Sequence, residues 1–274
     1  MIECKICFHA CRLEEGQTGF CRARRNINGE VQLISYGKVT SVALDPIEKK
    51  PLRRFYPGTT ILSLGGYGCN LSCPFCQNYA IAMSDEKNAK TSPLSPVEVV
   101  RLAEHYQAQG NIGVAYTFNE PMISLEYILD TAKLVHQAGM KNVLVTNGTI
   151  NEQPLRRLLP YIDAMNIDLK GFNQAFYDKL HGDLESVKRT ISIAAKSCHV
   201  EITTLIIPGE NDSDGEMEAE AKWLSQISLE MPLHLSRFFP NHQWMDKSIT
   251  PVETLYHLQK IANKYLKHVY IGNV

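Results

Sequence analysis

The sequence predicts an α/β fold, an open partial barrel of six strand–helix units with a small cysteine-rich cap at the N-terminus. From residue 59 onward, short runs rich in β-branched residues alternate with longer amphipathic stretches, which is typical of parallel strands joined by right-handed helical crossovers. The six units span about 215 residues, whereas a closed barrel of eight units takes about 250. An open partial barrel therefore fits best, and a doubly wound sheet is the alternative.

Two kinds of segment make up the predicted barrel. The strand pattern occurs at residues 59–66, 111–118, 142–148, 164–171, 199–209 and 231–238. The helix pattern occurs at residues 95–110, 123–139, 183–197, 213–228 and 250–266. In the first helix we expect Ser95 to be the N-cap, Pro96 to take the first helical position and Gly110 to end the segment. Gly139 ends the second helix in the same way.

Length and composition limit the domain organisation and the location. The chain has 274 residues, of which 44% are hydrophobic and 21% charged, and we expect a core domain at residues 56–274 and a cap at residues 1–55. A formal net charge of −1 argues against general nucleic-acid binding. No apolar run approaches the roughly 18 residues of a membrane helix, so we expect a cytoplasmic protein without membrane attachment.

Polar side chains follow one predicted strand after another, at the ends where the βα loops of such folds converge. After the three cysteines of the first loop they are Asn119, Glu120, Asn147, Asp168, Lys170, His234 and Ser236. Because strand side chains alternate, Asp168 and Lys170 face the same way, and so do His234 and Ser236. We therefore expect these groups to share one site at the carboxyl ends of the strands.

Three cysteines, Cys69, Cys73 and Cys76, lie on the loop after the first strand. Cytoplasmic cysteines are kept reduced, so their clustering points to metal rather than to disulfides. Three thiolates bind three irons of a [4Fe–4S] cluster and leave the fourth iron without a protein ligand. With Phe75 before the last cysteine, this CxxxCxxC motif resembles the signature of the radical S-adenosylmethionine (SAM) superfamily, whose members have a partial barrel of this type.

The resemblance implies a specific chemistry. SAM chelates the open iron through its methionyl amino and carboxylate groups, and reduction of the cluster cleaves the sulfonium to give a 5′-deoxyadenosyl radical. That radical abstracts hydrogen from a substrate, here an unknown small molecule or protein. Low-potential clusters lie near about −400 mV, so a ferredoxin or flavodoxin is the expected reductant.

The other predicted site residues have properties that suit parts of SAM. Glu120 suits the methionyl ammonium and Lys170 suits the methionyl carboxylate. Ribose hydroxyls suit Asp168 and also the pair of His234 and Ser236. Phe75, Asn119 and Asn147 are also expected to take part in cofactor binding, and Asn147 could equally fix its loop or belong only to a turn. A structural hydrogen bond is the alternative for each of these side chains.

Two subgroups of the superfamily are similar to this chain. The segments CPFCQN, TNG and DLKG resemble the activating enzymes that install glycyl radicals, such as pyruvate formate-lyase activating enzyme. The chain departs from them at Phe118-Asn119, where they have two glycines, and at Val145, where they have aspartate. The segments CKICFHACRLEEGQTGFC, TFNEP and HLSRFFP, among others along essentially the whole chain, resemble the radical enzyme of the AmmeMemoRadiSam group.

Three functions therefore stay open at this point. The first is a radical SAM enzyme whose substrate the resemblance does not supply. The second is an activating enzyme for a glycyl-radical enzyme, as the first subgroup implies. The third is a non-catalytic iron–sulfur or zinc protein on the same fold.

A second cysteine set lies in the cap, and its members are Cys4, Cys7, Cys11 and Cys21. Four thiolates complete a tetrahedral zinc site and equally complete an auxiliary iron–sulfur cluster, so ligand identity alone does not separate the two. His9 is an alternative ligand to one of the thiols. A cap of this size is too short to build a good core without such a staple.

Overall fold

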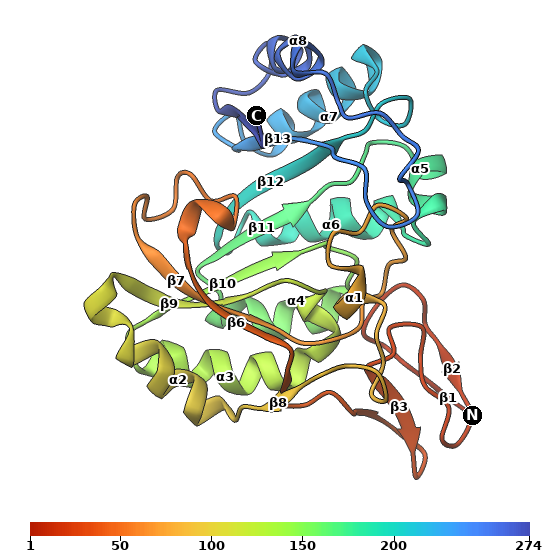
Figure 1. Ribbon diagram of the computed structural model, residues 1–274, viewed down its shortest axis with the longest axis vertical. Coiled ribbons are helices and arrows are strands. Elements are labelled where there is room, and N and C mark those ends of the chain that lie inside the picture. The colour runs from red at the N-terminus through yellow and green to blue at the C-terminus, as the bar shows by residue number, and fades with distance from the viewer.

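The computed structural model describes residues 1–274 and contains one curved sheet of eight strands (Figure 1). Its strands are β6 (Ser41–Pro46), β7 (Thr60–Gly65), β9 (Asn111–Tyr116), β10 (Lys141–Thr146), β11 (Ala164–Asp168), β12 (His199–Ile206), β13 (Leu233–Arg237) and β14 (Val269–Gly272). All pairs from β7 to β14 are parallel, and β6 is antiparallel to β7.

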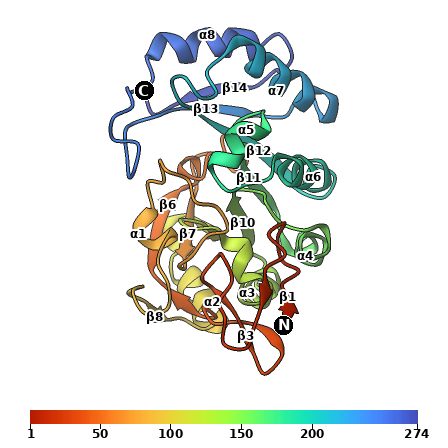
Figure 2. The same cartoon turned by 90° about the vertical axis from the view of Figure 1, so that its right-hand side faces the viewer.

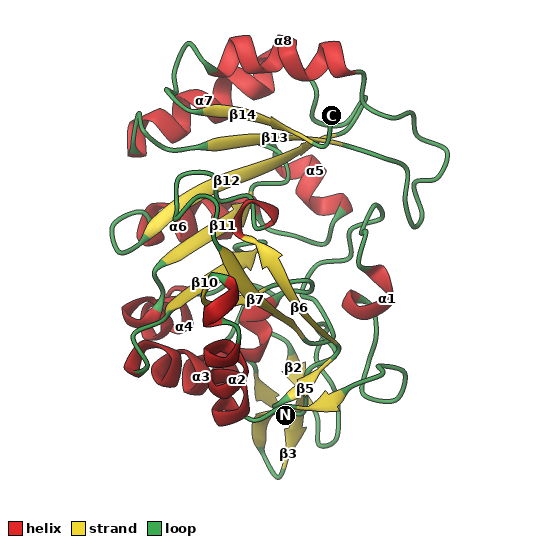
Figure 3. Cartoon of the chain, turned by 60° about the vertical axis from the view of Figure 1, so that its left-hand side comes forward, coloured by secondary structure: helices red, strands yellow, loops and turns green.

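The strand order identifies the architecture as a partial barrel. From β7 to β14 the strands stand side by side in their order along the chain. A doubly wound sheet reverses its order at a switch point, so that alternative is wrong. Figures 2 and 3 show the longer helices gathered along the outer side of the curved sheet. The six predicted strand–helix units are confirmed, and β6 and β14 extend the sheet beyond them.

The α-helices are α1 (Tyr79–Ala82), α2 (Pro96–His105), α3 (Leu125–Gln137), α4 (Glu152–Leu158), α5 (Gln174–Lys179), α6 (Leu184–Ala194), α7 (Asp214–Ile227) and α8 (Val252–Ala262). The five longest helices, α2, α3, α6, α7 and α8, follow the predicted segments closely, whereas α1, α4 and α5 were not predicted. At the start of α2 the Ser95 hydroxyl accepts from the Glu98 amide and the Glu98 carboxylate accepts from the Ser95 amide, a complete capping box. The sequence pattern did not predict α4, which is short and has Pro154 inside its first turn.

The main hydrophobic core lies between the sheet and the outer helices, where 44 buried side chains form one cluster. Leu144, Met165 and Leu233 contribute to it from the strands. One carboxyl group is buried in this layer: Glu220 on α7 accepts a hydrogen bond of 2.6 Å from the Thr204 hydroxyl. Burial raises the pKa of Glu220 to about 8.

A second, smaller cluster closes the barrel at the amino ends of the strands. Ile47, Leu52 and Phe55 from the segment between β6 and β7 pack there against inward side chains such as Val143 and Ala164. These residues form a floor beneath the barrel interior. The barrel interior is therefore closed at the amino ends of the strands, which leaves the carboxyl ends for a site.

Glu201 of β12 holds this floor in place and is fully buried. Its carboxylate accepts the backbone amides of Arg53 at 3.0 Å and Arg54 at 2.8 Å. It also bonds to the ring nitrogens of His199 at 2.9 Å and His234 at 2.6 Å. Burial alone would raise the pKa of Glu201, but these hydrogen bonds lower it to about 2.

The N-terminal residues form small antiparallel pairs beside the barrel, visible in red and orange in Figures 1 and 2. The pairs are β1 (Ile2–Glu3) with β2 (Arg12–Leu13), β3 (Arg24–Ile27) with β4 (Glu30–Leu33), and β5 (Lys38–Val39) with β8 (Ser92–Pro93). The division into a cap of residues 1–55 and a core of residues 56–274 stays a prediction, although β6 already pairs within the main sheet. No helix is both long and apolar enough to cross a membrane.

Candidate functional site

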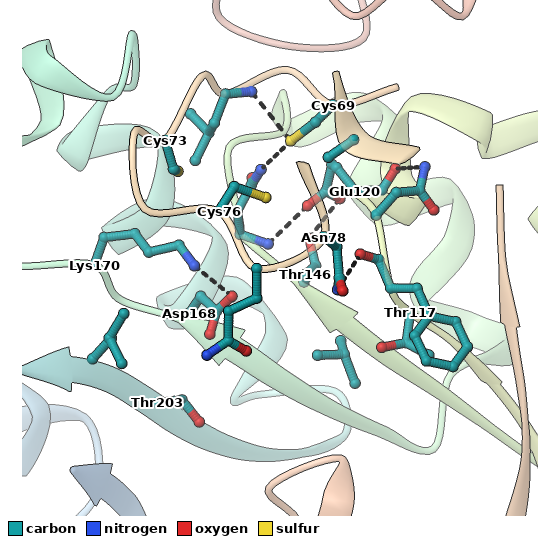
Figure 4. A pocket seen from close by; sticks show the side chains of 18 of the residues that line it. Cys69, Cys73, Cys76, Asn78, Thr117, Glu120, Thr146, Asp168, Lys170 and Thr203 are labelled. Atoms are coloured by element: carbon teal, nitrogen blue, oxygen red, sulfur yellow. Dashed lines mark hydrogen bonds and ion pairs between the residues drawn. The ribbon is translucent and has the colours of Figure 1, made fainter. Parts of the chain in front are cut away.

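A pocket of about 270 Å³ opens at the carboxyl ends of the parallel strands (Figure 4). The predicted site residues that line it are Cys69, Cys73, Phe75, Cys76, Asn119, Glu120, Asn147, Asp168, Lys170 and Ser236. They come from loops and strand ends that are up to 167 positions apart in the sequence (236 − 69). The topology therefore brings together the groups that the strand-end pattern predicted to meet.

The cysteine loop runs from the end of β7 to α1 and forms one wall of the pocket. The Cys76 amide donates to the Cys73 carbonyl at 3.1 Å, and the Leu71 amide donates to the Cys69 sulfur at 3.3 Å. Cys73 and Phe75 are buried against Phe176 of α5. Burial raises the pKa of Cys73 to about 12 and also raises the pKa of Cys69 well above its usual value.

The three thiols fit the prediction of an iron–sulfur cluster. In a [4Fe–4S] cluster each thiolate binds its own iron, so the sulfurs need to line one space without converging on a single point. Cys69, Cys73 and Cys76 line the same pocket. As the side chains stand, no three His, Cys, Asp or Glu residues of the chain form the compact group that holds one metal ion.

Glu120 connects the loops after β9 and β10 and is 3% exposed. One oxygen accepts from the Met122 amide at 2.9 Å and from the Thr146 hydroxyl at 2.7 Å. The other accepts from the Asn147 amide at 2.8 Å. Burial raises the pKa of Glu120 to about 7, although these hydrogen bonds oppose the shift.

Asp168 and Lys170 face the pocket side by side, as the alternation of strand residues predicts (Figure 4). The Lys170 ammonium lies 2.7 Å from the Asp168 carboxylate. Burial acts to lower the pKa of Lys170, but the charges of Asp168, Cys73 and Cys76 raise it overall. Lys170 is therefore cationic and close to the cysteine loop.

Two amide side chains brace the cysteine loop. Asn147 donates to the Cys69 sulfur at 3.7 Å and to the Asn70 side-chain oxygen at 2.9 Å. Asn119 accepts from the Gly66 amide at 3.0 Å and donates to the Gly68 carbonyl at 3.0 Å. Both side chains also line the pocket, so the hydrogen bonds that hold the cysteine loop lie at the pocket wall.

The structure places one predicted site residue elsewhere. Ser236 lines the pocket, but His234 does not. His234 lies two residues earlier on the same strand face, roughly 7 Å deeper in the barrel, where its ring bonds to Glu201. The expected role of His234 toward ribose stays a prediction, and in this structure its ring contacts Glu201 of the barrel floor.

Several pocket residues were not predicted. Thr203 and Leu205 line it from β12, and Asn273 lines it from the end of β14. The same alternation rule applied to β12 would have found the first two, because they are separated by two positions. Asn273 had no such signal, since β14 was not among the expected strands.

Phe118 also lines the pocket and has an uncommon backbone conformation, with φ of 69°. Its carbonyl accepts from the Asn78 side chain at 2.8 Å. A Cβ atom at Gly65 would lie 2.8 Å from Phe118, so a glycine is needed beneath the ring. The buried Lys50 ammonium lies over the Phe118 ring, 4.9 Å from its centroid.

The N-terminal cysteines lie outside the pocket. Cys4, Cys7 and Cys21 are buried and Cys11 is partly exposed. The Nε2 atom of His9 is 2.8 Å from the Asn70 carbonyl oxygen, and such a bond leaves the other ring nitrogen able to bind metal. Neither zinc nor a second cluster is therefore assigned to this set by the pocket geometry.

Known proteins share sequence and fold with this chain. Residues 64–221 match the family described as the Radical SAM superfamily. An uncharacterized protein of Methanocaldococcus jannaschii is 42% identical over 277 residues, covering 100% of this chain and 81% of that protein. Pyruvate formate-lyase 1-activating enzyme of Escherichia coli K12 is 26% identical, covering 65% of this chain and 74% of that enzyme.

The solved structure of QueE from Escherichia coli has a similar backbone. It aligns with a TM-score of 0.54 over 86% of this chain and 94% of QueE, at 14% sequence identity. At this identity the likeness concerns the fold alone. It agrees with the partial barrel described above.

Proposed function

The chain belongs to the radical SAM superfamily, and we propose that it is an enzyme that cleaves SAM reductively at a [4Fe–4S] cluster and abstracts hydrogen from a substrate. The observation that carries this proposal is the common pocket of Cys69, Cys73 and Cys76 with Asp168 and Lys170. The cluster and SAM, when bound, supply the carbon radical. The protein binds both, orients them and excludes water.

In this proposal the three thiolates hold three irons, and the fourth iron stays open to SAM. Lys170 is cationic and pairs with the methionyl carboxylate, for which a charge-assisted bond is well suited. Asp168 and Ser236 accept from ribose hydroxyls. The support for these assignments is that all three side chains line the pocket beside the cysteine loop.

Glu120 has limited capacity left for the methionyl ammonium. A carboxylate offers about four acceptor positions, and the protein fills three of them with Met122, Thr146 and Asn147. We propose that Glu120 receives one bond from the ammonium and mainly fixes the loops around it. Its removal would disturb both the SAM site and the braces of the cysteine loop.

A one-electron reductant completes the reaction, and we propose a ferredoxin or flavodoxin because ferredoxin-type clusters have potentials near about −400 mV. Activation of a glycyl-radical enzyme is a second candidate function. It is favoured by the similarity to pyruvate formate-lyase 1-activating enzyme across 65% of this chain. Incubating the reconstituted protein with a glycyl-radical enzyme and recording its electron paramagnetic resonance spectrum tests that candidate.

The Cys73→Ala variant tests the proposal. Anaerobic reconstitution with iron and sulfide, followed by dithionite and SAM, should give 5′-deoxyadenosine with the wild-type chain and none with this variant. Cys198→Ala is the matched control, because Cys198 lies outside the pocket and its thiol contacts the Ala194 carbonyl. A wild-type rate from Cys73→Ala would show that the motif does not hold the reactive cluster.

A further inference from the structure

We propose that Tyr177 and Asn211 are positioning residues for Lys170, and that their hydrogen bonds to the Lys170 backbone fix its ammonium where the methionyl carboxylate of SAM binds. Neither side chain lines the pocket, so both act on SAM only through Lys170. The inference rests on the proposed function, in which Lys170 pairs with that carboxylate. We call the two side chains the Lys170 clamp.

Lys170 lies just beyond the point where β11 and β12 separate. The last paired residues of the two strands are Asp168 and Thr203, and one further backbone bond joins the Leu169 amide to the Thr203 carbonyl at 2.9 Å. Beyond this bond Lys170 has no partner residue on β12. A backbone amide and carbonyl that are shielded from water need hydrogen-bond partners, so other parts of the chain must supply them.

Tyr177 of α5 supplies the acceptor. Its hydroxyl oxygen accepts from the Lys170 amide at 3.0 Å, and its side chain is fully buried. Gly182 leaves room for the ring, because a Cβ atom there would lie 2.8 Å from a ring carbon of Tyr177. The phenol therefore reaches Lys170 from a fixed, buried position.

Asn211, on the loop after β12, supplies the donor and is 2% exposed. The N–H groups of its side chain donate to the Lys170 carbonyl at 2.7 Å and to the Leu205 carbonyl at 2.8 Å. Its side-chain oxygen accepts from the Ile207 amide at 2.8 Å. Two carbonyls cannot bond to each other, so an amide with two N–H donors is well suited to join the separating strands.

The chain directly after Lys170 is held as well. A Cβ atom at Gly171 would lie 2.8 Å from the Phe176 ring and 3.0 Å from the Glu216 carboxylate of α7. That carboxylate accepts from the Phe172 amide at 2.6 Å. Lys170 is therefore fixed both at its own backbone groups and through the segment that follows it.

The clamp fixes the start of a flexible side chain. Lysine carries its ammonium on a four-carbon stem, and binding groups need to lie within about 0.5 Å of their productive positions. The Lys170 ammonium is 2.7 Å from Asp168, so a shift of the Lys170 backbone would also move it relative to a second proposed SAM contact. Loss of the clamp should therefore weaken SAM binding through Lys170.

A double-mutant cycle with Lys170→Met tests this dependence. Tyr177→Phe removes the acceptor and Asn211→Leu removes the donors, and each is made in the wild-type chain and in Lys170→Met. The chains are reconstituted with iron and sulfide, matched for iron content and titrated with SAM. In the wild-type chain each change should raise the dissociation constant about three- to tenfold. In Lys170→Met the same changes should raise it by less than about twofold, because the group that they position is gone.

Tyr116→Phe and Asn142→Leu are the matched controls. The Tyr116 hydroxyl donates to the Asn142 side chain at 3.0 Å, and Asn142 donates to the Ala132 carbonyl at 2.9 Å. Both residues are buried and lie outside the pocket. These changes should destabilise the fold in a similar way but leave SAM affinity within about twofold of wild type. A loss of affinity as large as that of the clamp variants would overturn the proposal, because general destabilisation would then explain both.

Two results of the cycle would also overturn the clamp. One is an equal rise of the dissociation constant in the wild-type and Lys170→Met chains, and the other is unchanged affinity in the wild-type chain. If Asn211→Leu does not fold, Tyr177→Phe decides the test, because it removes only one hydroxyl. Unchanged affinity in Lys170→Met itself would overturn the proposed role of Lys170, and the clamp with it.

Discussion

Replacing Lys170 with methionine separates a role in cofactor binding from a role in the barrel. The change keeps the length and the apolar part of the side chain and removes the ammonium. The Lys170 and Asp168 side chains are 16% and 30% exposed, and they are joined at 2.7 Å. A pair this accessible to water contributes about 0.2–1 kcal/mol to folding, so the free energy of unfolding should fall by less than about 1 kcal/mol.

The effect on SAM should be larger. A charge-assisted bond from Lys170 to the methionyl carboxylate contributes roughly 1.5–3 kcal/mol. Each 1.4 kcal/mol corresponds to about a tenfold change in affinity, so the dissociation constant of SAM should rise about 10- to 100-fold. Asp168→Asn should have a smaller effect, because an amide oxygen still accepts from a ribose hydroxyl.

The assay is a titration of reconstituted protein with SAM, with chemical unfolding measured on the same samples. Iron content is determined for each variant, since Lys170 lies close to Cys73 and Cys76. The double variant Asp168→Asn/Lys170→Met shows whether the two changes act on one contact. Unchanged SAM affinity in a destabilised, fully iron-loaded Lys170→Met chain would refute the reasoning and leave the pair with a structural role only.

Four further predictions concern the scaffold. Because burial raises the pKa of Glu220 from an ordinary 4.5 to about 8, the folded chain binds the extra proton between these values, and stability should fall as pH rises from about 5 to 8. In urea unfolding measured across this pH range, Glu220→Gln should lose less stability than the wild-type chain. An equal dependence of unfolding free energy on pH in the two chains would contradict the prediction. Glu201→Ala should lower the free energy of unfolding by roughly 3 kcal/mol or more, because each unsatisfied buried donor costs about 1–3 kcal/mol. His234→Ala should leave the affinity for SAM within about twofold of wild type. A larger loss of affinity in a SAM titration would support a role of His234 in the cofactor site. Gly68→Ala should lower iron loading, because its Cβ would lie 2.2 Å from the Cys21 carbonyl oxygen; normal iron content would show that the contact yields without effect.

Much of the site follows from local sequence rules. The two-residue alternation along a strand was sufficient to place Asp168 and Lys170 together. The same rule does not decide the role of His234, because alternation gives the face of a strand but not the direction in which a side chain turns. His234 pairs with Thr203, which lines the pocket, yet the His234 ring bonds to Glu201 of the floor. That bond joins two strands and is not visible in either segment alone.

Other features depended on contacts between distant segments. The strand β14 has only four residues, too few for a periodic pattern to distinguish it from the end of a loop. The contact between Gly68 and Cys21 joins positions whose motifs were each visible, but nothing in either motif indicates the other. The bond between the His9 ring and the Asn70 carbonyl likewise joins distant segments, and nothing in the sequence near either residue indicates it.

The barrel floor imposes an order on folding. Each parallel strand pairs with the one made before it, so the sheet can grow from its N-terminal side as the ribosome adds successive units. The amides of Arg53 and Arg54, however, bond to Glu201, which is synthesised 148 and 147 residues later. Until Glu201 is made, the segment that carries Ile47 and Phe55 lacks these two hydrogen bonds. We therefore expect nascent chains that end before Glu201 to expose this segment and to be the species that chaperones retain.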